Sequence, residues 1–466
     1  MPREAAKLGA MQAWHGAILW FDPHTEEPHV HFEPDGWLVT AADADGVQRV
    51  VAVGPADALR AAYPDAAVTD CRGCLIAPGF IDLHIHYPQT DVIGSPADGL
   101  LPWLERYTFP HEARFADADH AAEVARFFVD ELLRHGVTTA LAFATSHPVS
   151  VDALLIEAGA RGLRCIAGKV LQDRHSPDGV RDETERSLAD TEALIARWHG
   201  RGRLGYAITP RFAPSCSDAQ MRGAGELAGR YPDVWVQSHV AENVDEVRWV
   251  RELYPHDRSY LAVYERFGLL RPRAVYAHGI YLDDADRALL AQTGAAIAVS
   301  PTSNMFLGSG FFDFAAARAD AVRHGLASDV GGGMSFDPFV TMRAAYTVGR
   351  AAVRGDGQPK EGVSLSPSEL WWRHTAGAAR ALGLGGVVGS LAPGSEADFV
   401  VLDAQAMPLL ARRTAQAASL AEWLFAWVML ADERAVRQVV VAGAAAAQQT
   451  FTVPSSPLHG GALSLP

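Results

Sequence analysis

Two histidines at the end of an apolar segment are the residues of this chain best suited to chemistry. The segment Pro78–His86 has the pattern of a β-strand and ends with His84 and His86. Side chains at positions i and i+2 of a strand point to the same face, so both imidazoles can reach one metal ion. Because the chain contains 18 histidines, a single His-x-His pair can also arise by chance. Further ligands, a proton-transfer group and a substrate pocket must come from elsewhere.

Other strand-like segments end in groups that would complete a metal site, namely His239, His278 and Asp329. Three neutral imidazoles with one carboxylate suit Zn²⁺, with Fe²⁺ as the second choice. Glu242, three residues after His239, is placed to move protons rather than to bind the metal. Each residue also has a structural interpretation. Either histidine could be a hydrogen-bonded core residue, Asp329 could cap a helix, and Glu242 could be a surface carboxylate.

The elements that must position these groups alternate between apolar strands and helical patterns. Eight strands are expected, at Pro78–His86, Val137–Ala144, Leu163–Leu171, Arg203–Phe212, Val234–Val240, Ala274–Ile280, Ala295–Pro301 and Gly325–Val330. Helical patterns such as Ala121–Arg134 and Glu183–Trp198 lie between them. Eight such units predict an α/β fold, a (β/α)₈ TIM-like barrel whose chemistry collects at the carboxyl ends of the strands. A doubly wound open sheet is the alternative.

The sequence pattern at both ends of the chain differs from the alternating strands and helices between them, because short apolar runs are separated there by turn residues. Examples are Arg49–Gly54 near the start and Val436–Gly443 near the end. These runs predict antiparallel strands that build one small β-sandwich domain together. The expected division is residues 1–76 for the first part of this domain, 77–385 for the catalytic barrel, and 386–466 for the second part with a tail. The tail after Pro454 shows little pattern and is expected to be mobile.

Composition excludes several classes of function. The 466 residues carry 40 basic and 55 acidic side chains, a net charge of −15, which disfavours nucleic acid as a partner. Four cysteines do not make a disulfide framework. The N-terminal residues lack a signal-peptide pattern, and no apolar run approaches the ~20 residues that span a bilayer. A cytoplasmic protein without membrane contact is therefore expected.

The complete set of motifs resembles the metal-dependent amidohydrolase superfamily and, within it, the guanine deaminase family. The matching stretches are His84-x-His86, Ser238-His239-x-x-Glu242, Pro78–Asp91, Leu101–Phe115, Thr209–Ser217, Ser300–Gly310, Ser328–Ser335 and Gly389–Asp403. This resemblance implies hydrolytic deamination of guanine to xanthine and ammonia, one Zn²⁺ per subunit and a homodimer. It also implies that the segment Leu101–Phe115 closes over the pocket or makes a subunit contact. Met334 departs from the family pattern and could change the shape of the pocket.

The resemblance also implies a role for each site residue. The metal ligands would be His84, His86, His239 and Asp329. The catalytic groups would be Glu242, Asp329 and His278. Substrate contacts would come from Gln89, Arg211, Phe212, His278 and His86. The chemistry of these side chains agrees, because Phe212 offers an aromatic face, Gln89 a donor and an acceptor, and Arg211 a donor fork for a carbonyl oxygen.

Alternative interpretations remain open at this stage. A deaminase of another purine, a pterin or a triazine would use the same metal site, and a non-catalytic barrel would keep the fold alone. A second His-x-His pair, His29 and His31, is expected at the surface. Cys71 and Cys74 only superficially resemble a cytidine-deaminase site. Lys169, on the third strand, is not expected to bridge two metal ions.

Overall fold

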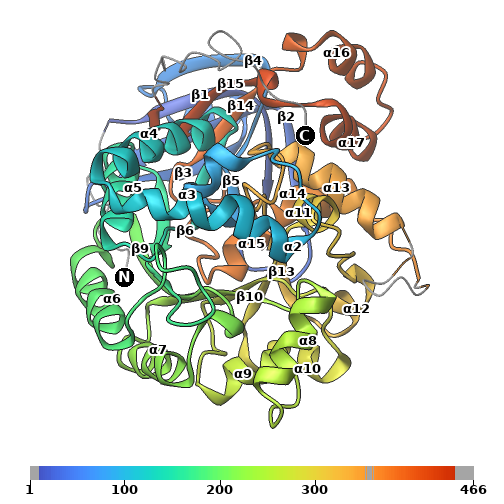
Figure 1. Ribbon diagram of the computed structural model, residues 1–466. Helices are drawn as coiled ribbons and strands as arrows, with labels where there is room; N and C mark the ends of the chain where they lie inside the picture. The colour runs from blue at the N-terminus through green and yellow to red at the C-terminus, as the bar shows by residue number, and fades with distance from the viewer. Residues whose placement is uncertain (1–9, 352, 354–358, 360, 447–466) are drawn as a thin grey trace, which may run out of the picture.

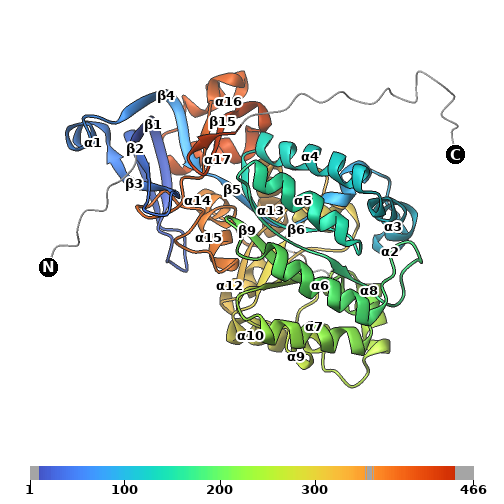
Figure 2. The same cartoon turned by 90° about the vertical axis from the view of Figure 1, so that its left-hand side faces the viewer.

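The computed structural model describes residues 10–351, 353, 359 and 361–446. The predicted tail after Pro454 lies outside the described residues. Two β-sheets organise the chain, a parallel one surrounded by helices and a second one at its side (Figure 1 and Figure 2). The chain passes between the two sheets at Gly79, whose backbone N–H donates to the carbonyl of Asp398 at 3.1 Å.

The parallel sheet is a nearly closed barrel, which confirms the predicted (β/α)₈ fold. Its path runs β5-β6-β7-β9-β10-β11-β12-β13, and β8 adds a short pairing to β9. The strands are β5 (Phe80–His86), β6 (Val137–Phe143), β7 (Arg164–Gly168), β8 (Val170–Leu171), β9 (Leu204–Pro210), β10 (Trp235–Val240), β11 (Ala274–His278), β12 (Ala296–Val299) and β13 (Arg323–Leu326). The gap between β13 and β5 is bridged just after β13, where His86 N donates to Val330 O and Asp329 N donates to His84 O, both at 2.9 Å.

The third and eighth predicted strands are shorter in the structure. The third is divided into β7 and β8 at Lys169, because the N–H of Lys169 donates to the hydroxyl of Tyr206 at 3.1 Å instead of joining the sheet. The eighth strand ends at Leu326, so Asp329 lies in the loop that follows. Both differences leave the order of strands unchanged.

Helices cover the outside of the barrel, and one of them, α15, packs against one end of it. In α4 the buried residues recur at helical spacing, Ala121, Val124, Ala125 and Phe128, and Asp117 caps its first turn through Asp119 N and His120 N. The helices are α4 (Ala118–Arg134), α5 (Pro148–Ala160), α6 (Thr184–Trp198), α7 (Asp218–Arg230), α8 (Val244–Leu253), α9 (Tyr260–Arg266), α10 (Asp284–Thr293), α11 (Pro301–Phe306), α12 (Phe314–Ala319), α13 (Pro338–Arg350), α14 (Pro367–Arg373) and α15 (Ala376–Ala381). Alanines of α15 belong to a buried apolar cluster with side chains of the barrel strands such as Leu83, Ile166 and Val275.

The second sheet joins the two ends of the chain in the order β16-β15-β14-β4-β1-β2-β3. Its strands are β1 (Gln12–Phe21), β2 (Val30–Ala42), β3 (Gln48–Pro55), β4 (Ala67–Pro78), β14 (Phe399–Leu402), β15 (Val436–Val441) and β16 (Ala444–Ala445), and α1 (Ala56–Ala62) follows β3. The small domain predicted from both chain ends is thus present as one continuous hydrogen-bonded sheet. Bulges next to Gly16 interrupt its register, and one face packs around Trp14 and Phe399, whose ring centroids lie 5.0 Å apart.

Two helices between β14 and β15 were not predicted from the sequence. They are α16 (Pro408–Thr414) and α17 (Leu420–Leu430), and α17 packs against α13 and α14. The signal for α17 was available, because Ser419 accepts a hydrogen bond from Glu422 N as a helix cap. Within the described residues, no helix is long and apolar enough to cross a membrane.

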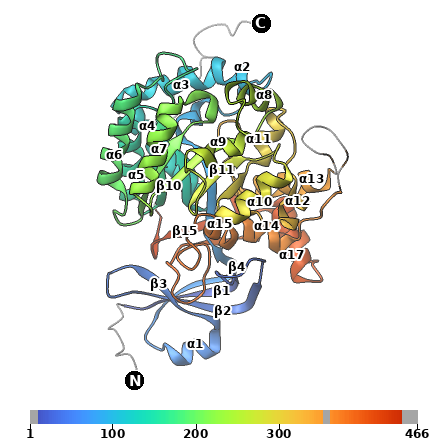
Figure 3. The same ribbon diagram turned by 90° about the horizontal axis from the view of Figure 1, so that it is seen from below.

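A chain of short helices follows β5 and lies at the end of the barrel away from the second sheet (Figure 3). It consists of the turn η1 (Tyr87–Val92), α2 (Leu100–Trp103), the π-helical turn η2 (Leu104–Thr108), α3 (Phe109–Ala113) and η3 (Arg114–Ala116). We call residues 100–116 the 100–116 segment. The remaining short turns are η4 (Ala213–Ser215), η5 (Ala404–Ala406) and η6 (Glu433–Ala435).

Candidate metal centre and active site

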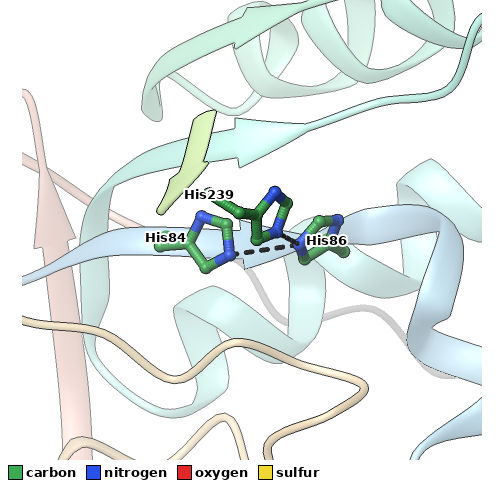
Figure 4. Close-up of side chains that lie close together, drawn as sticks. All are labelled: His84, His86 and His239. Atoms are coloured by element: carbon green, nitrogen blue, oxygen red, sulfur yellow. Dashed lines mark hydrogen bonds between the residues drawn. The ribbon is translucent and has the colours of Figure 1, made fainter. Parts of the chain in front are cut away.

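Three imidazoles converge at the carboxyl ends of β5 and β10. His84 and His86 point to the same side of β5, and His239 approaches them from β10 (Figure 4). The Nε2 atom of His86 lies 3.1 Å from that of His84 and 3.2 Å from that of His239. All three side chains belong to a compact group of possible metal ligands. The alternation of side chains along a strand therefore places the first predicted pair as expected.

Asp329 completes this group from the loop after β13. Its Oδ1 atom lies 3.1 Å from His84 Nε2 and 3.4 Å from His86 Nε2. Ligand atoms bound to a tetrahedral ion at ~2.0–2.1 Å lie roughly 3.3 Å apart, so these spacings fit a single divalent ion. The structure thus brings together all four residues predicted as metal ligands.

The electrostatics of the four side chains also suit a cation. Burial lowers the pKa of His84, and holds the pKa values of His86 and His239 well below the usual range. These imidazoles are therefore neutral near pH 7, which is the form that binds metals. Burial alone would raise the pKa of Asp329, but the adjacent His84 and other histidines lower it below its ordinary value. The site thus presents lone pairs and one negative charge.

Neighbouring groups orient the ligands. His239 Nδ1 lies 2.6 Å from the carbonyl oxygen of Arg211 and donates to it, which leaves Nε2 free for a metal. The carboxylate of Asp82 accepts hydrogen bonds from His84 N and Ser328 N, both at 3.1 Å, and so ties β5 to the loop after β13. The ring of Phe143 packs against the His84, His86 and His239 rings.

His278 stands beside the metal group at the end of β11. Its Nδ1 atom lies 2.8 Å from Asn304 Oδ1 and donates to it. Its Nε2 atom makes no hydrogen bond to any described residue, and lies 3.4 Å from Glu242 Oε2 and 3.8 Å from Asp329 Oδ2. Burial lowers the pKa of His278, but Glu242 and Asp329 outweigh it and raise the value. This nitrogen can therefore exchange a proton with a bound molecule.

Glu242 is a fully enclosed carboxyl group at the mouth of β10. Burial raises its pKa to about 7, against a smaller opposing effect of His278. Ser309 Oγ donates to its Oε1 atom at 3.0 Å, and its backbone N–H donates to Glu246 at 2.9 Å. The surface interpretation of Glu242 is therefore wrong. A carboxyl that titrates near neutral pH can both accept and return a proton.

Three of the seven described non-glycine residues with a positive φ angle lie at this site. Ala241, His278 and Asp329 have positive φ angles of 48°, 75° and 52°, a region that residues other than glycine rarely adopt. Such conformations persist where the surrounding structure requires them, and they cluster at functional sites.

Several of these groups line a pocket whose volume is about 430 Å³, a value that includes solvent at its mouth. The lining residues are His86, Gln89, Leu100, Trp103, Leu104, Arg211, Phe212, His239, Glu242, Glu246, His278, Leu307, Asp329 and Gly332. The 100–116 segment thus contributes to the wall of the pocket, one of the two roles left open for it. Met334 is 50% exposed and is not among the described residues that line the pocket.

All five predicted substrate contacts line the pocket, and two of them are held from behind by Glu112, a residue that the sequence did not reveal. Arg211 and Gln89 are buried, and both bind the carboxylate of Glu112 in α3. Phe212 also lines the pocket, with its ring centroid 6.0 Å from that of Trp249. Glu112 belongs to a helical stretch between two strands, where no strand-end rule applies. The acidic residue in Phe109-Pro110-His111-Glu112 is the signal that could have been used.

The other residues considered from the sequence have structural partners. His29 and His31 both pair with Asp22 at the hairpin of β1 and β2, and these three side chains form a second, more exposed group of possible ligands. Lys169 is buried, and its Nζ atom lies 2.9 Å from Asp182 Oδ1. Cys71 and Cys74 are buried in the core of the second sheet.

Comparison with known protein families shows which family the chain belongs to. The profile of the amidohydrolase family matches residues 75–446. The chain belongs to the amidohydrolase family. A second, short match over residues 48–66 is to a bacterial imidazolonepropionase-like composite domain.

Several relatives of this amidohydrolase are named guanine deaminases. Guanine deaminase of Escherichia coli (strain K12) is 44% identical over 376 residues, 81% of this chain and 84% of the relative. The solved structure of E. coli guanine deaminase matches 94% of this chain and 100% of its own, with a TM-score of 0.89 and 40% identity. Guanine deaminase from C. acetobutylicum, solved with guanine in its active site, matches 94% and 100%, with a TM-score of 0.83 and 29% identity. Within the amidohydrolase family, the chain therefore belongs with the guanine deaminases.

Proposed function

We propose that the protein hydrolyses guanine to xanthine and ammonia in a metal-dependent reaction. The observation that carries the proposal is a single pocket lined by members of the metal-ligand cluster, by the carboxyl group of Glu242 and by the pair Arg211-Phe212. Relatives that match most of the chain are named guanine deaminases. The reaction replaces the 2-amino group of the purine with an oxygen atom from water.

One divalent ion, Zn²⁺ in the first place and Fe²⁺ in the second, would be held by His84, His86, His239 and Asp329. Their nitrogen and oxygen atoms converge, and neutral imidazoles with one carboxylate are ligands that suit such a cation. When bound, such an ion supplies the Lewis acidity that makes water a nucleophile near neutral pH. The spacing of the ligands supports one ion per subunit.

The substrate would lie against Phe212 and be read at its edge by Arg211 and Gln89. Arg211 uses two of its five N–H donors on Glu112, so three remain for acceptors such as the 6-carbonyl oxygen. Gln89 donates to Glu112 at 3.1 Å and accepts from Gly331 N at 3.3 Å, and its amide keeps one further donor. Apolar side chains of the 100–116 segment would cover the ring and exclude bulk water.

Proton transfer is assigned to Glu242, with His278 beside it. Glu242 would accept a proton from the attacking water and pass it to the ring nitrogen adjacent to the amino-bearing carbon. It would then take the second proton of that water from the added hydroxyl and deliver it to the amine, which leaves as ammonia while the hydroxyl oxygen becomes the new carbonyl. Its pKa of about 7 suits both directions of transfer. His278 would donate to the oxygen that is being added, and Asn304 holds its ring in place.

We also propose that the enzyme is a cytoplasmic homodimer whose partner is a small-molecule purine rather than nucleic acid or a membrane. The net charge of −15 supports the exclusion of nucleic acid, and the resemblance to the family supports the dimer. Light scattering after size-exclusion chromatography would give a mass of about twice the 50.0 kDa chain; a mass of one chain would contradict the dimer.

The test of the function is a substrate panel with metal-loaded protein. Guanine, adenine, a pterin and an aminotriazine are each followed by ultraviolet absorbance, with ammonia assayed in parallel. Conversion of guanine to xanthine with a kcat/KM at least about 100-fold above adenine and the aminotriazine is expected, because a site built for a carbonyl group rejects rings without it. The pterin carries the same carbonyl and tests the size of the ring that the pocket accepts. Preference for another ring would replace guanine as the substrate. Absence of turnover on all rings would favour a non-catalytic barrel.

A further inference from the structure

Glu112 is a fully buried carboxylate that stands behind the pocket rather than in it. It lies in α3 with no measurable exposure, and it is not among the described residues that line the pocket. Its Oε2 atom accepts from Arg211 Nη1 at 2.6 Å, and its Oε1 atom accepts from Arg211 Nη2 at 3.0 Å and from Gln89 Nε2 at 3.1 Å. One carboxylate thus holds Arg211 and Gln89, the two polar side chains proposed to contact the edge of the purine.

The guanidinium of Arg211 is fixed on more than one side. Glu112 occupies one edge of the fork in a bidentate ion pair, and the Phe109 ring lies against its face with the centroid 5.0 Å from Cζ. A bidentate pair sets orientation as well as charge. The donors that remain on Arg211 therefore point in a direction that Glu112 determines.

The same contacts join several loops of the barrel. The Gln89 side chain bridges from Glu112 to Gly331, two residues after Asp329. The backbone carbonyl of Arg211 accepts from His239 Nδ1. Glu112 thus lies at the centre of a network that runs from the 100–116 segment to the loop that carries Asp329 and to His239 in β10.

We propose that Glu112 is a positioning residue for substrate selection, and that it fixes Arg211 and Gln89 so that their free donors read the carbonyl group of the purine. This inference rests on the proposed function, because it concerns recognition at that same site. Glu112 does not contact the substrate, so its effect is on which ring is accepted and not on the proton-transfer step.

The experiment compares two substrates that share the reacting amino group and differ at the carbonyl. Guanine carries the 6-carbonyl oxygen, and 2-aminopurine lacks it. For the unaltered protein, Glu112→Gln and the matched control Glu105→Gln, an exposed residue of the same segment, kcat and KM are measured on both, together with metal content and thermal unfolding.

In Glu112→Gln, the preference for guanine over 2-aminopurine is expected to fall at least about tenfold, because the neutral amide cannot hold the guanidinium in a bidentate ion pair. The loss should appear mainly as a higher KM for guanine, with metal content unchanged. Glu105→Gln should keep the preference of the unaltered protein. Glu112→Asp keeps the charge but shortens the reach, and an intermediate preference is expected.

A Glu112→Gln variant that loses activity equally on both substrates would show a structural role only and would overturn the inference. If that variant does not fold, Glu112→Asp with an unchanged preference would overturn it equally. Lack of guanine turnover by the unaltered protein would instead refute the proposed function, and this inference with it. Turnover of guanine with an altered preference in the variant supports both.

Discussion

Replacing Glu242 with glutamine removes the proton-transfer group while leaving its surroundings intact. The amide oxygen can still accept the hydrogen bond from Ser309, which is 3.0 Å long in the unaltered protein. Glu242 is not part of the groups that could hold the metal, so metal content should stay at one ion per chain. The variant therefore separates proton transfer from folding and from metal binding.

The expected loss can be worked out from the role. Proton transfer by a positioned side chain contributes about 10²–10⁴ in rate, and each factor of ten corresponds to about 1.4 kcal/mol of activation free energy. The kcat of Glu242→Gln should therefore fall by roughly 100-fold or more, a cost of about 3–5 kcal/mol. Glu252→Gln, the same change at an exposed position of α8, should leave kcat unchanged.

The pH profile provides a second readout. Burial raises the pKa of Glu242 to about 7, and a cation in the adjacent site would lower it again. Because the ionised form is the base, activity of the unaltered enzyme should be lost as the pH falls through a value at or below about 7, and this limb should be absent in Glu242→Gln. Stopped assays of xanthine from pH 5 to 9 measure both. A variant with full metal content and a kcat within a few-fold of the unaltered protein would refute the role.

Three further substitutions test the fold and the pocket. Burial raises the pKa of Asp337 to about 6 from 3.8, so its ionisation lowers the stability of the folded protein as the pH rises through 4–6. In chemical unfolding, Asp337→Asn should be more stable than the unaltered protein by up to roughly 3 kcal/mol at pH 8 and equally stable at pH 4. Equal unfolding curves of the two proteins at pH 8 would contradict this. Gly168→Ala places a Cβ 1.7 Å from Ala207 O and should lower the unfolding free energy by about 1–3 kcal/mol or more; an unchanged melting temperature would disprove the close packing. Met334→Ala should leave the KM for guanine unchanged, since this half-exposed side chain is outside the pocket lining, and a shift in KM would return it to the list of pocket residues.

The ligand cluster was predictable because it depends on local rules. Strand alternation places His84 and His86 on one face, and the carboxyl ends of parallel strands meet at one end of the barrel, which brings in His239 and His278. Asp329 was assigned to the same end although β13 stops at Leu326. The assignment succeeded because the loop after β13 remains hydrogen-bonded to β5.

The contacts that depend on tertiary packing were not predictable in this way. Glu112 lies 99 residues before Arg211 in the chain, in a helical segment whose placement no periodicity rule gives. The division of the third strand at Lys169 results from a hydrogen bond to Tyr206, a long-range partner. Only strands are predicted from the sequence near the C-terminus, although Ser419 is a helix-cap signal at the start of α17.

The central claim is that one buried ion, held by the His84, His86, His239 and Asp329 cluster, is required for guanine turnover. The most direct test is to strip the protein with a chelator, titrate it with Zn²⁺, and measure bound metal and xanthine formation in the same samples. Activity should be absent without metal and should rise in proportion to bound zinc until one equivalent is bound, and His239→Ala should prevent this rise. Turnover by metal-free protein, or a rise that continues to two equivalents, would contradict the account.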